Sequence, residues 1–115
     1  MGEIKTITGK IKKFRDERDW KQFHNHKDVA LSLMLEAAEV LEHFQWKSTQ
    51  EVDQHAEECK NEIADELADV AIYSFELADN LGINLSQAIE NKIKKNALKY
   101  PVEKAKGSIK KYTRL

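Results

Sequence analysis

The sequence contains one cysteine, one proline and four glycines in 115 residues. A lone Cys59 excludes an internal disulfide, and no cysteine–histidine cluster has the spacing of a zinc site. No apolar run approaches the ~18 residues needed to cross a membrane, and the N-terminus lacks the apolar segment of a secretory signal. We therefore expect a cytoplasmic protein without a membrane partner. The scarcity of proline and glycine beside 34% charged residues favours a helical protein over a sheet-rich one.

The length predicts a single domain over residues 1–115, with a basic C-terminal tail over 101–115. The net charge of −1 argues against a nucleic acid polymer as partner. The charges are nevertheless unevenly distributed. Residues 36–69 contain eleven acidic and two basic residues, whereas residues 92–115 contain nine basic residues and one acidic residue. An acidic middle followed by a basic tail suits a metal site that also binds a polyanion.

Apolar periodicity predicts four helices. The first ends near Arg18, and a loop of about eight residues within 19–28 separates it from a second helix over 27–46. A capping box of Ser48 and Glu51 opens a third helix, which we expect to continue unbroken to Leu81 and to end at Gly82. A fourth helix runs from a cap at Asn84 to about residue 99.

These helices indicate an all-α protein, a four-helix bundle. The third predicted helix is apolar or small over about half of its circumference, so it has two packing surfaces. In so short a chain the second neighbour is expected to come from another subunit, which predicts a homo-oligomer.

The pattern that points to chemistry is a pair of carboxylate pairs. Glu36 and Glu39 are three residues apart on the second predicted helix, and Glu66 and Asp69 are three apart on the third. Residues at this spacing share a helix face, and each pair borders the apolar seam. Carboxylates brought together and partly buried repel one another, and a divalent cation would compensate that repulsion.

The residue types favour Mg²⁺ as that cation. Carboxylate oxygens without cysteine suit a hard ion, and Mg²⁺ combines a few carboxylates with water and phosphate oxygens. Di-iron bundle proteins require Glu-x-x-His pairs, and no histidine of this chain has a glutamate three positions before it. An exposed charged helix face is the alternative explanation of each single pair.

Two segments, LEAAEVLEHFQWK and EIADELADVAIYSFELA, together resemble the E-x-x-E…E-x-x-D signature of the MazG-like all-α nucleoside triphosphate pyrophosphohydrolases. The ordered series RDWKQFH, FQWK, KYP and GSIKKYTRL is similar to the dCTP pyrophosphatase branch of that family. The resemblance covers nearly the whole chain from about Phe14.

The resemblance implies roles for individual residues. Glu36, Glu39, Glu66 and Asp69 match the residues that hold Mg²⁺ against the triphosphate. Pocket residues for base and sugar are matched by Trp20, His24 and Trp46, and positions near the phosphates by Tyr73, Lys92, Asn96 and Tyr100. Family members assemble as dimers or tetramers, and a tetramer is the favoured expectation here. Independently, Lys92 and Asn96 share one helix face and offer hydrogen-bond donors to phosphates.

The implied reaction is Mg²⁺-dependent hydrolysis of a (deoxy)nucleoside triphosphate, dCTP-like, to the monophosphate and pyrophosphate, which would clean the nucleotide pool. Either Glu39 or Glu62 is the candidate general base. Two residues depart from the pattern: Ile11 stands where a histidine is expected, and His43 stands where relatives have an apolar residue, one turn from Glu39.

Two other functions remain open at this point. One is a non-catalytic helical oligomer whose acidic edge binds a basic partner. The other is a hydrolase of the same scaffold that acts on another diphosphate substrate, such as dUTP or a phosphoribosyl nucleotide.

Overall fold

A computed structural model describes residues 2–115, and all regular structure in this range is helical. The α-helices are α1 (Glu3–Glu17), α2 (His26–Glu42), α3 (Thr49–Glu58), α4 (Lys60–Asn80), α5 (Leu85–Lys99) and the short α6 (Val102–Ala105). Two 3₁₀ turns, η1 (Lys21–Phe23) and η2 (Tyr112–Arg114), complete the order. The all-α prediction is confirmed. No helix within residues 2–115 has the length and apolar character needed to span a membrane.

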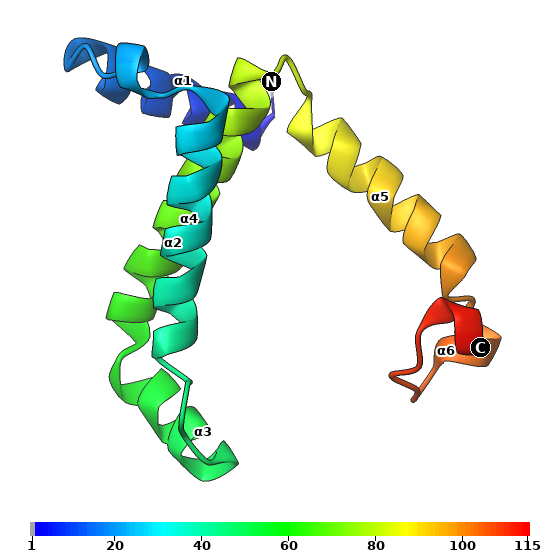
Figure 1. The fold of residues 1–115 in the computed structure, drawn as a ribbon. Helices are drawn as coiled ribbons and strands as arrows, with labels where there is room; N and C mark the ends of the chain where they lie inside the picture. Colours follow the sequence, from blue (N-terminus) through cyan, green and yellow to red (C-terminus); the bar gives the residue numbers. More distant parts are fainter. Residues whose placement is uncertain (1) are drawn as a thin grey trace. The chain divides into compact units, whose positions relative to one another are not determined.

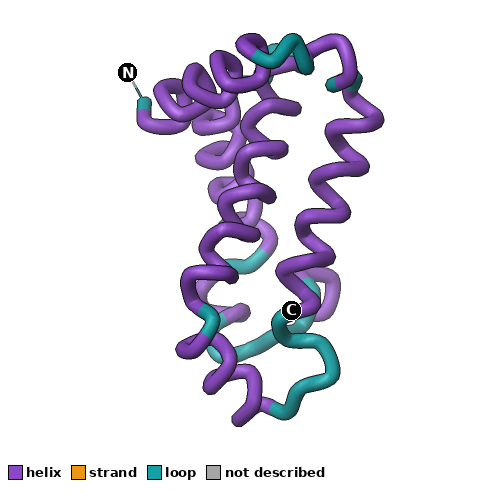
Figure 2. Tube along the Cα trace, turned by 90° about the vertical axis from the view of Figure 1, so that its left-hand side faces the viewer, coloured by secondary structure: helices purple, strands orange, loops and turns teal. Residues whose placement is uncertain are grey.

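The chain divides into two compact units, one up to Gly82 and one from Ile83 to Leu115. In the first unit α2 and α4 lie side by side along most of their length and make its most extensive contact (Figures 1 and 2). Helix α1 packs against α4 at the end where α2 begins, and α3 packs at the opposite end. The α2–α4 pair is therefore the scaffold that positions both predicted carboxylate pairs.

The second unit comprises α5, α6 and η2. Its C-terminal part is held by aromatic contacts around Tyr112. Tyr100 packs edge-on against the Tyr112 ring at a centroid distance of 6.1 Å, and the Lys99 ammonium lies 4.9 Å from the centre of the same ring. The predicted basic tail thus includes two short helical segments. The expectation of a single domain remains a prediction.

The predicted helix ends are largely confirmed. Ser48 and Glu51 form a reciprocal capping box at the start of α3. The Asn84 side chain accepts a hydrogen bond from the Gln87 backbone at 3.1 Å and caps α5. Gly82 has a φ of +69°, the left-handed conformation that follows the end of α4.

The predicted unbroken helix from Ser48 to Leu81 is wrong, because the chain forms two helices separated at Cys59. The backbone of Cys59 is non-helical, with φ −112° and ψ 26°. Its N–H closes the last turn of α3 on the His55 carbonyl, and its own carbonyl accepts the first bond of α4, from Ile63. Few backbone hydrogen bonds are lost at this break, so it forms without a proline or a glycine. The apolar periodicity of the sequence therefore does not reveal it.

The second predicted helix ends at Glu42 rather than Trp46. Beyond Glu42, backbone hydrogen bonds that span three residues appear, as in a 3₁₀ turn. An example is the Phe44 N–H, which donates to the Leu41 carbonyl at 2.9 Å. Trp46 then takes a positive φ of 65°. This tight turn redirects the chain into α3.

The apolar core of the described residues is small. Its buried side chains are Val29, 2% exposed, and Ala78, 7% exposed. Large apolar side chains on α2, α4 and α5 remain substantially exposed, among them Leu31, Met34, Leu35, Leu41, Leu67, Ile93 and Leu98. Patches of this kind are typical of interaction surfaces.

Candidate active site on helices α2 and α4

The two carboxylate pairs lie on the two helices that pack together. Glu36 and Glu39 are on α2, and Glu66 and Asp69 are on α4. Three of the four side chains are half-buried, and Glu39 is exposed. The buried Oε2 atom of Glu36 has no hydrogen-bond partner among the described residues. A buried carboxylate oxygen without a partner is costly, and it is the atom that a bound cation would compensate.

The four carboxylates share one electrostatic neighbourhood. The pKa of Glu36 is raised above its ordinary value of 4.5, first by burial and then by Glu39, Asp69 and Glu66. Each of the other three groups thus lies close enough to disfavour the charge on Glu36. Across residues 2–115, however, no three acidic, histidine or cysteine side chains already stand in a complete metal-ligand arrangement. The donor set fits a hard cation in chemistry and in charge, and its oxygens would have to draw together around the ion.

His43, at the end of α2, lies against Glu66. Its Nε2 atom contacts Glu66 Oε2, without the alignment of a well-formed hydrogen bond. On its other side, His43 Nδ1 is 2.7 Å from Nε2 of His55 on α3. The structure therefore places His43 beside Glu66, whereas sequence spacing suggested Glu39. The role of His55 is not visible in the sequence, because the turn from α2 into α3 brings it there.

A cavity of about 450 Å³ adjoins this carboxylate cluster. Asp69 lines it, together with Tyr73 and Glu76 further along α4. Ile72 on α4 also contributes. The remaining walls come from α1 and from the segment after α1, and they are Ile7, Lys10, Ile11, Phe14, Arg15, Trp20 and His24. Three of the predicted substrate residues, Trp20, His24 and Tyr73, thus meet around one cavity. Asp69 joins that cavity to the carboxylates.

A tight turn after α1 puts Trp20 into the cavity wall. Asp19 adopts a positive φ of 52°, and the Trp20 N–H donates back to the Arg15 carbonyl at 3.1 Å. The indole then packs edge-on against Phe14 at 5.8 Å and lies 6.5 Å from the His24 ring. The result is a flat, partly exposed aromatic surface at the cavity, of the kind on which a nucleobase can stack.

Tyr73 lies between the carboxylate cluster and the rest of the cavity. Burial raises the pKa of its phenol, and the carboxylates of Glu36, Asp69 and Glu76 raise it further. The hydroxyl therefore stays protonated at neutral pH and can donate a hydrogen bond to an anion.

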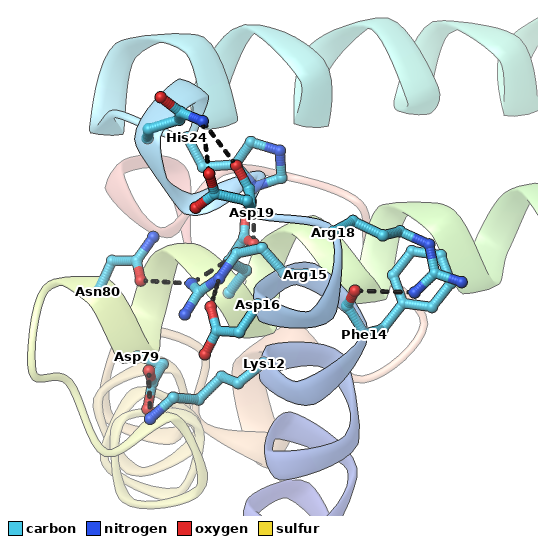
Figure 3. Close-up of polar contacts among 11 residues, drawn as sticks. Lys12, Phe14, Arg15, Asp16, Arg18, Asp19, His24, Asp79 and Asn80 are labelled. Atoms are coloured by element: carbon cyan, nitrogen blue, oxygen red, sulfur yellow. Dashed lines mark hydrogen bonds and ion pairs between the residues drawn. The ribbon is translucent and has the colours of Figure 1, made fainter.

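Sequence reasoning missed two charged residues of this cavity, Arg15 and Glu76. Both are almost completely buried, at 3% and 2% exposed. Arg15 Nη1 lies 3.6 Å from Glu76 Oε1. The same Nη1 donates to Asn80 Oδ1 at 3.2 Å, and Arg15 Nε donates to Asp16 Oδ1 at 2.9 Å (Figure 3). The available signal was the position of Glu76 between Phe75 and Leu77, seven residues after Asp69 on the same helix face.

His24 completes this buried group. Its Nδ1 lies 2.8 Å and 3.0 Å from the two carboxylate oxygens of Glu76. Because an ionised carboxylate only accepts hydrogen bonds, the proton of this contact belongs to His24 Nδ1. His24 therefore has a defined partner in the cavity.

One predicted substrate residue of the first unit does not line the cavity. Trp46 lies in the turn after α2 and is 92% exposed. Lys92 and Asn96 on α5, and Tyr100 at its end, belong to the second unit. Their roles remain predictions.

Glu62, one of the two candidate bases, lies near the start of α4. Its carboxylate adjoins Cys59, where burial first and then Glu62 raise the pKa of the thiol. Glu62 is absent from the groups that shift the pKa of Glu36, whereas Glu39 is among them. Electrostatically, Glu39 belongs to the carboxylate cluster and Glu62 lies beside it.

The fold and the site define an all-helical protein with paired carboxylates on two packed helices beside a nucleoside-sized cavity. Residues 31–115 match the model of the MazG-like family. The chain belongs to this family, and the resemblance noted in the sequence is confirmed.

Curated relatives carry the name dCTP pyrophosphatase 1. The protein of Mus musculus is 42% identical and that of Homo sapiens 38% identical, each over 104 residues that make up 89% of this chain. The matched part is 61% of the length of either relative, so this chain spans about three-fifths of them.

Among solved structures, a pyrophosphatase from Archaeoglobus fulgidus superposes with a TM-score of 0.82 at 38% identity. The superposition covers 88% of this chain and 94% of that one. This likeness confirms the MazG-like helical fold.

Proposed function

We propose that this protein is a Mg²⁺-dependent nucleotide pyrophosphohydrolase that converts a (deoxy)nucleoside triphosphate into the monophosphate and pyrophosphate. One observation carries the proposal: the half-buried Glu36, with an unpartnered oxygen, faces three further carboxylates, and one of these, Asp69, also lines the adjoining cavity. A cation held there would meet the phosphates of a nucleotide whose nucleoside occupies the cavity. The family membership and the names of the relatives support the same reaction class.

Glu36, Glu39, Glu66 and Asp69 would hold the magnesium. When bound, Mg²⁺ neutralises phosphate charge and lowers the pKa of the attacking water. In the reaction, water attacks the α phosphorus. The bond from this phosphorus to the oxygen that bridges the α and β phosphates breaks, and pyrophosphate leaves with that oxygen. The water's proton passes to a carboxylate of the chain.

Glu39 is the better candidate for that proton acceptor. Both glutamates are exposed, but Glu39 belongs to the carboxylate cluster, whereas Glu62 adjoins Cys59. Trp20 and His24 would bind the nucleoside, and Tyr73 would donate to a phosphate oxygen. Trp46, Lys92, Asn96 and Tyr100 are further candidates for substrate contact, because they match the family's substrate positions.

The exposed apolar faces support a homo-oligomer. Light scattering coupled to gel filtration tests this part of the proposal, and a tetramer is the expected result. Clearance of unwanted nucleotides from the pool is the role that such a reaction would serve.

The deciding experiment is a substrate panel with product identification. The protein is incubated with Mg²⁺ and each of the common dNTPs, dUTP and a phosphoribosyl nucleotide, and pyrophosphate and monophosphate are quantified, with EDTA as the control. We expect equimolar pyrophosphate and monophosphate from at least one dNTP, and none with EDTA. Release of orthophosphate, or no turnover of any dNTP, would reject the proposal. Turnover of the phosphoribosyl nucleotide alone would be consistent with a hydrolase of this fold, but it would identify a different substrate.

A further inference from the structure

The buried carboxylate of Glu76 lies at the cavity but outside the metal cluster. It is seven residues after Asp69 on α4, which places it about 10 Å further along the helix axis. If the phosphates lie at Asp69, the sugar and base extend toward Glu76. The proposed reaction gives Glu76 no part, although burying a carboxylate this completely is costly.

Two cationic or donor groups hold that carboxylate in place. His24 Nδ1 contacts both of its oxygens, at 2.8 Å and 3.0 Å, and the Arg15 guanidinium lies 3.6 Å away. Arg15 is itself fixed by Asp16 and Asn80. The orientation of Glu76 is therefore determined before any ligand arrives, which is the property expected of a recognition group.

The hydrogen-bonding character of this end of the cavity follows from the same contacts. Glu76 is an acceptor with a lone pair remaining on each oxygen. His24 donates from Nδ1, so in its neutral form Nε2 is also an acceptor. Apart from Lys10, Arg15 and Asp69, the other side chains that line the cavity are apolar or aromatic, among them Phe14, Trp20 and Ile72. A ligand that reaches Glu76 must present hydrogen-bond donors.

We propose that Glu76, held by His24 and Arg15, selects nucleobases with an exocyclic amino group over those with a carbonyl oxygen at the same position. Cytosine presents an amino group where uracil and thymine present a carbonyl, and adenine and hypoxanthine differ in the same way. An amino group donates to the carboxylate, whereas a carbonyl oxygen is repelled by it and leaves its own acceptor unpaired. The proposal rests on the proposed function for the placement of the nucleotide, and it assigns base selection to a residue absent from the sequence prediction.

The test measures binding without turnover. Titration calorimetry in EDTA compares dCMP with dUMP, and dAMP with dIMP, on the wild-type protein and on Glu76→Gln. We expect the amino member of at least one pair to bind the wild type about tenfold more tightly. In Glu76→Gln that ratio should fall to about threefold or less, because an amide can offer either a donor or an acceptor. Glu17→Gln is the matched control, because Glu17 is exposed on α1 and does not line the cavity.

Glu76→Gln leaves Arg15 buried beside a neutral side chain, and it can fail to fold for that reason. The double variant Arg15→Met with Glu76→Gln removes both charges and provides a second measurement of the same ratio. Equal binding of both members of each pair by the wild type would overturn the inference. So would a preference that persists in a folded variant without the Glu76 carboxylate.

The two proposals fail separately. Selective binding of dCMP without pyrophosphate release from any dNTP would reject the proposed function and keep the assignment of Glu76. Pyrophosphate release from dCTP and dUTP with equal kcat/KM, together with equal binding of the monophosphates, would support the proposed function and reject the role of Glu76 in base selection.

Discussion

His43 Nδ1 and His55 Nε2 lie 2.7 Å apart and connect the end of α2 to α3. If His55 donates from Nε2, neutral His43 keeps its proton on Nε2, the atom that faces Glu66. The histidine pair thereby determines how the ring beside a candidate metal ligand is protonated and oriented. Contacts of this kind around metal ligands commonly alter metal affinity by 10- to 100-fold.

From this pair we predict that His55→Leu weakens Mg²⁺ binding about tenfold. The His55→Gln variant retains an N–H donor, so its Mg²⁺ affinity should decrease less. Mg²⁺ titration followed by calorimetry measures both. His26→Gln, an exposed histidine at the start of α2, is the control and should bind like the wild type. Equal Mg²⁺ affinity in all three variants would show that the pair is structural only.

Loss of a carboxylate from α4 should abolish turnover without unfolding the protein. Glu66→Gln and Asp69→Asn are each expected to lower kcat/KM by about 100-fold or more, because each removes a ligand rather than a group behind one. Circular dichroism should show unchanged helix content. Glu57→Gln, an exposed glutamate at the end of α3, should retain full activity. Wild-type rates in either α4 variant would place the metal elsewhere.

The stability of the metal-free protein should decrease as the pH rises above the ordinary pKa of a glutamate. The pKa of Glu36 is raised in the folded state, so between 4.5 and that raised value the folded chain binds more protons than the unfolded chain. Within this window unfolding becomes easier with increasing pH, and Mg²⁺ should reverse the loss at neutral pH.

The corresponding variant is Glu36→Gln. At neutral pH without metal, it should melt about 2–4 °C above the wild type and show a smaller pH dependence, and added Mg²⁺ should stabilise it less. Thermal melts between pH 4 and pH 8, with and without Mg²⁺, provide the measurement. A lower melting temperature for Glu36→Gln in EDTA would contradict the prediction.

Removal of Arg15 should be costly because it leaves Glu76 buried beside fewer compensating groups. We expect Arg15→Met to lower the free energy of unfolding by about 3 kcal/mol, and the double variant Arg15→Met with Glu76→Gln to recover part of that loss. Urea unfolding measures all of these values. Arg114→Met, at an exposed position in η2, should change stability by less than about 0.5 kcal/mol. If the single and double variants lost equal stability, the Arg15–Glu76 pair would contribute nothing.

Much of the fold could be predicted from local patterns. The apolar periodicity of α2 and α4, the capping box at Ser48 and Glu51, and the left-handed Gly82 each depend on residues within a few positions of one another. The break at Cys59 could not be predicted, since it contains no proline or glycine and keeps the helical bonds on either side. The end of α2 at Glu42 was missed because the turn that follows it also contains no proline or glycine.

The sequence by itself determined that the chain is helical, that Glu36 and Glu39 share one helix face, and that Glu66 and Asp69 share another, because a helix fixes the direction of residues three apart. Tertiary structure decided which other groups join them. Packing of α1 against α4 buries Arg15 with Glu76, and the turns after α1 and α2 bring His24 to Glu76 and His55 to His43. These contacts span 12 to 61 positions of the chain, so no local spacing rule specifies them, and burial of apolar faces determines them instead.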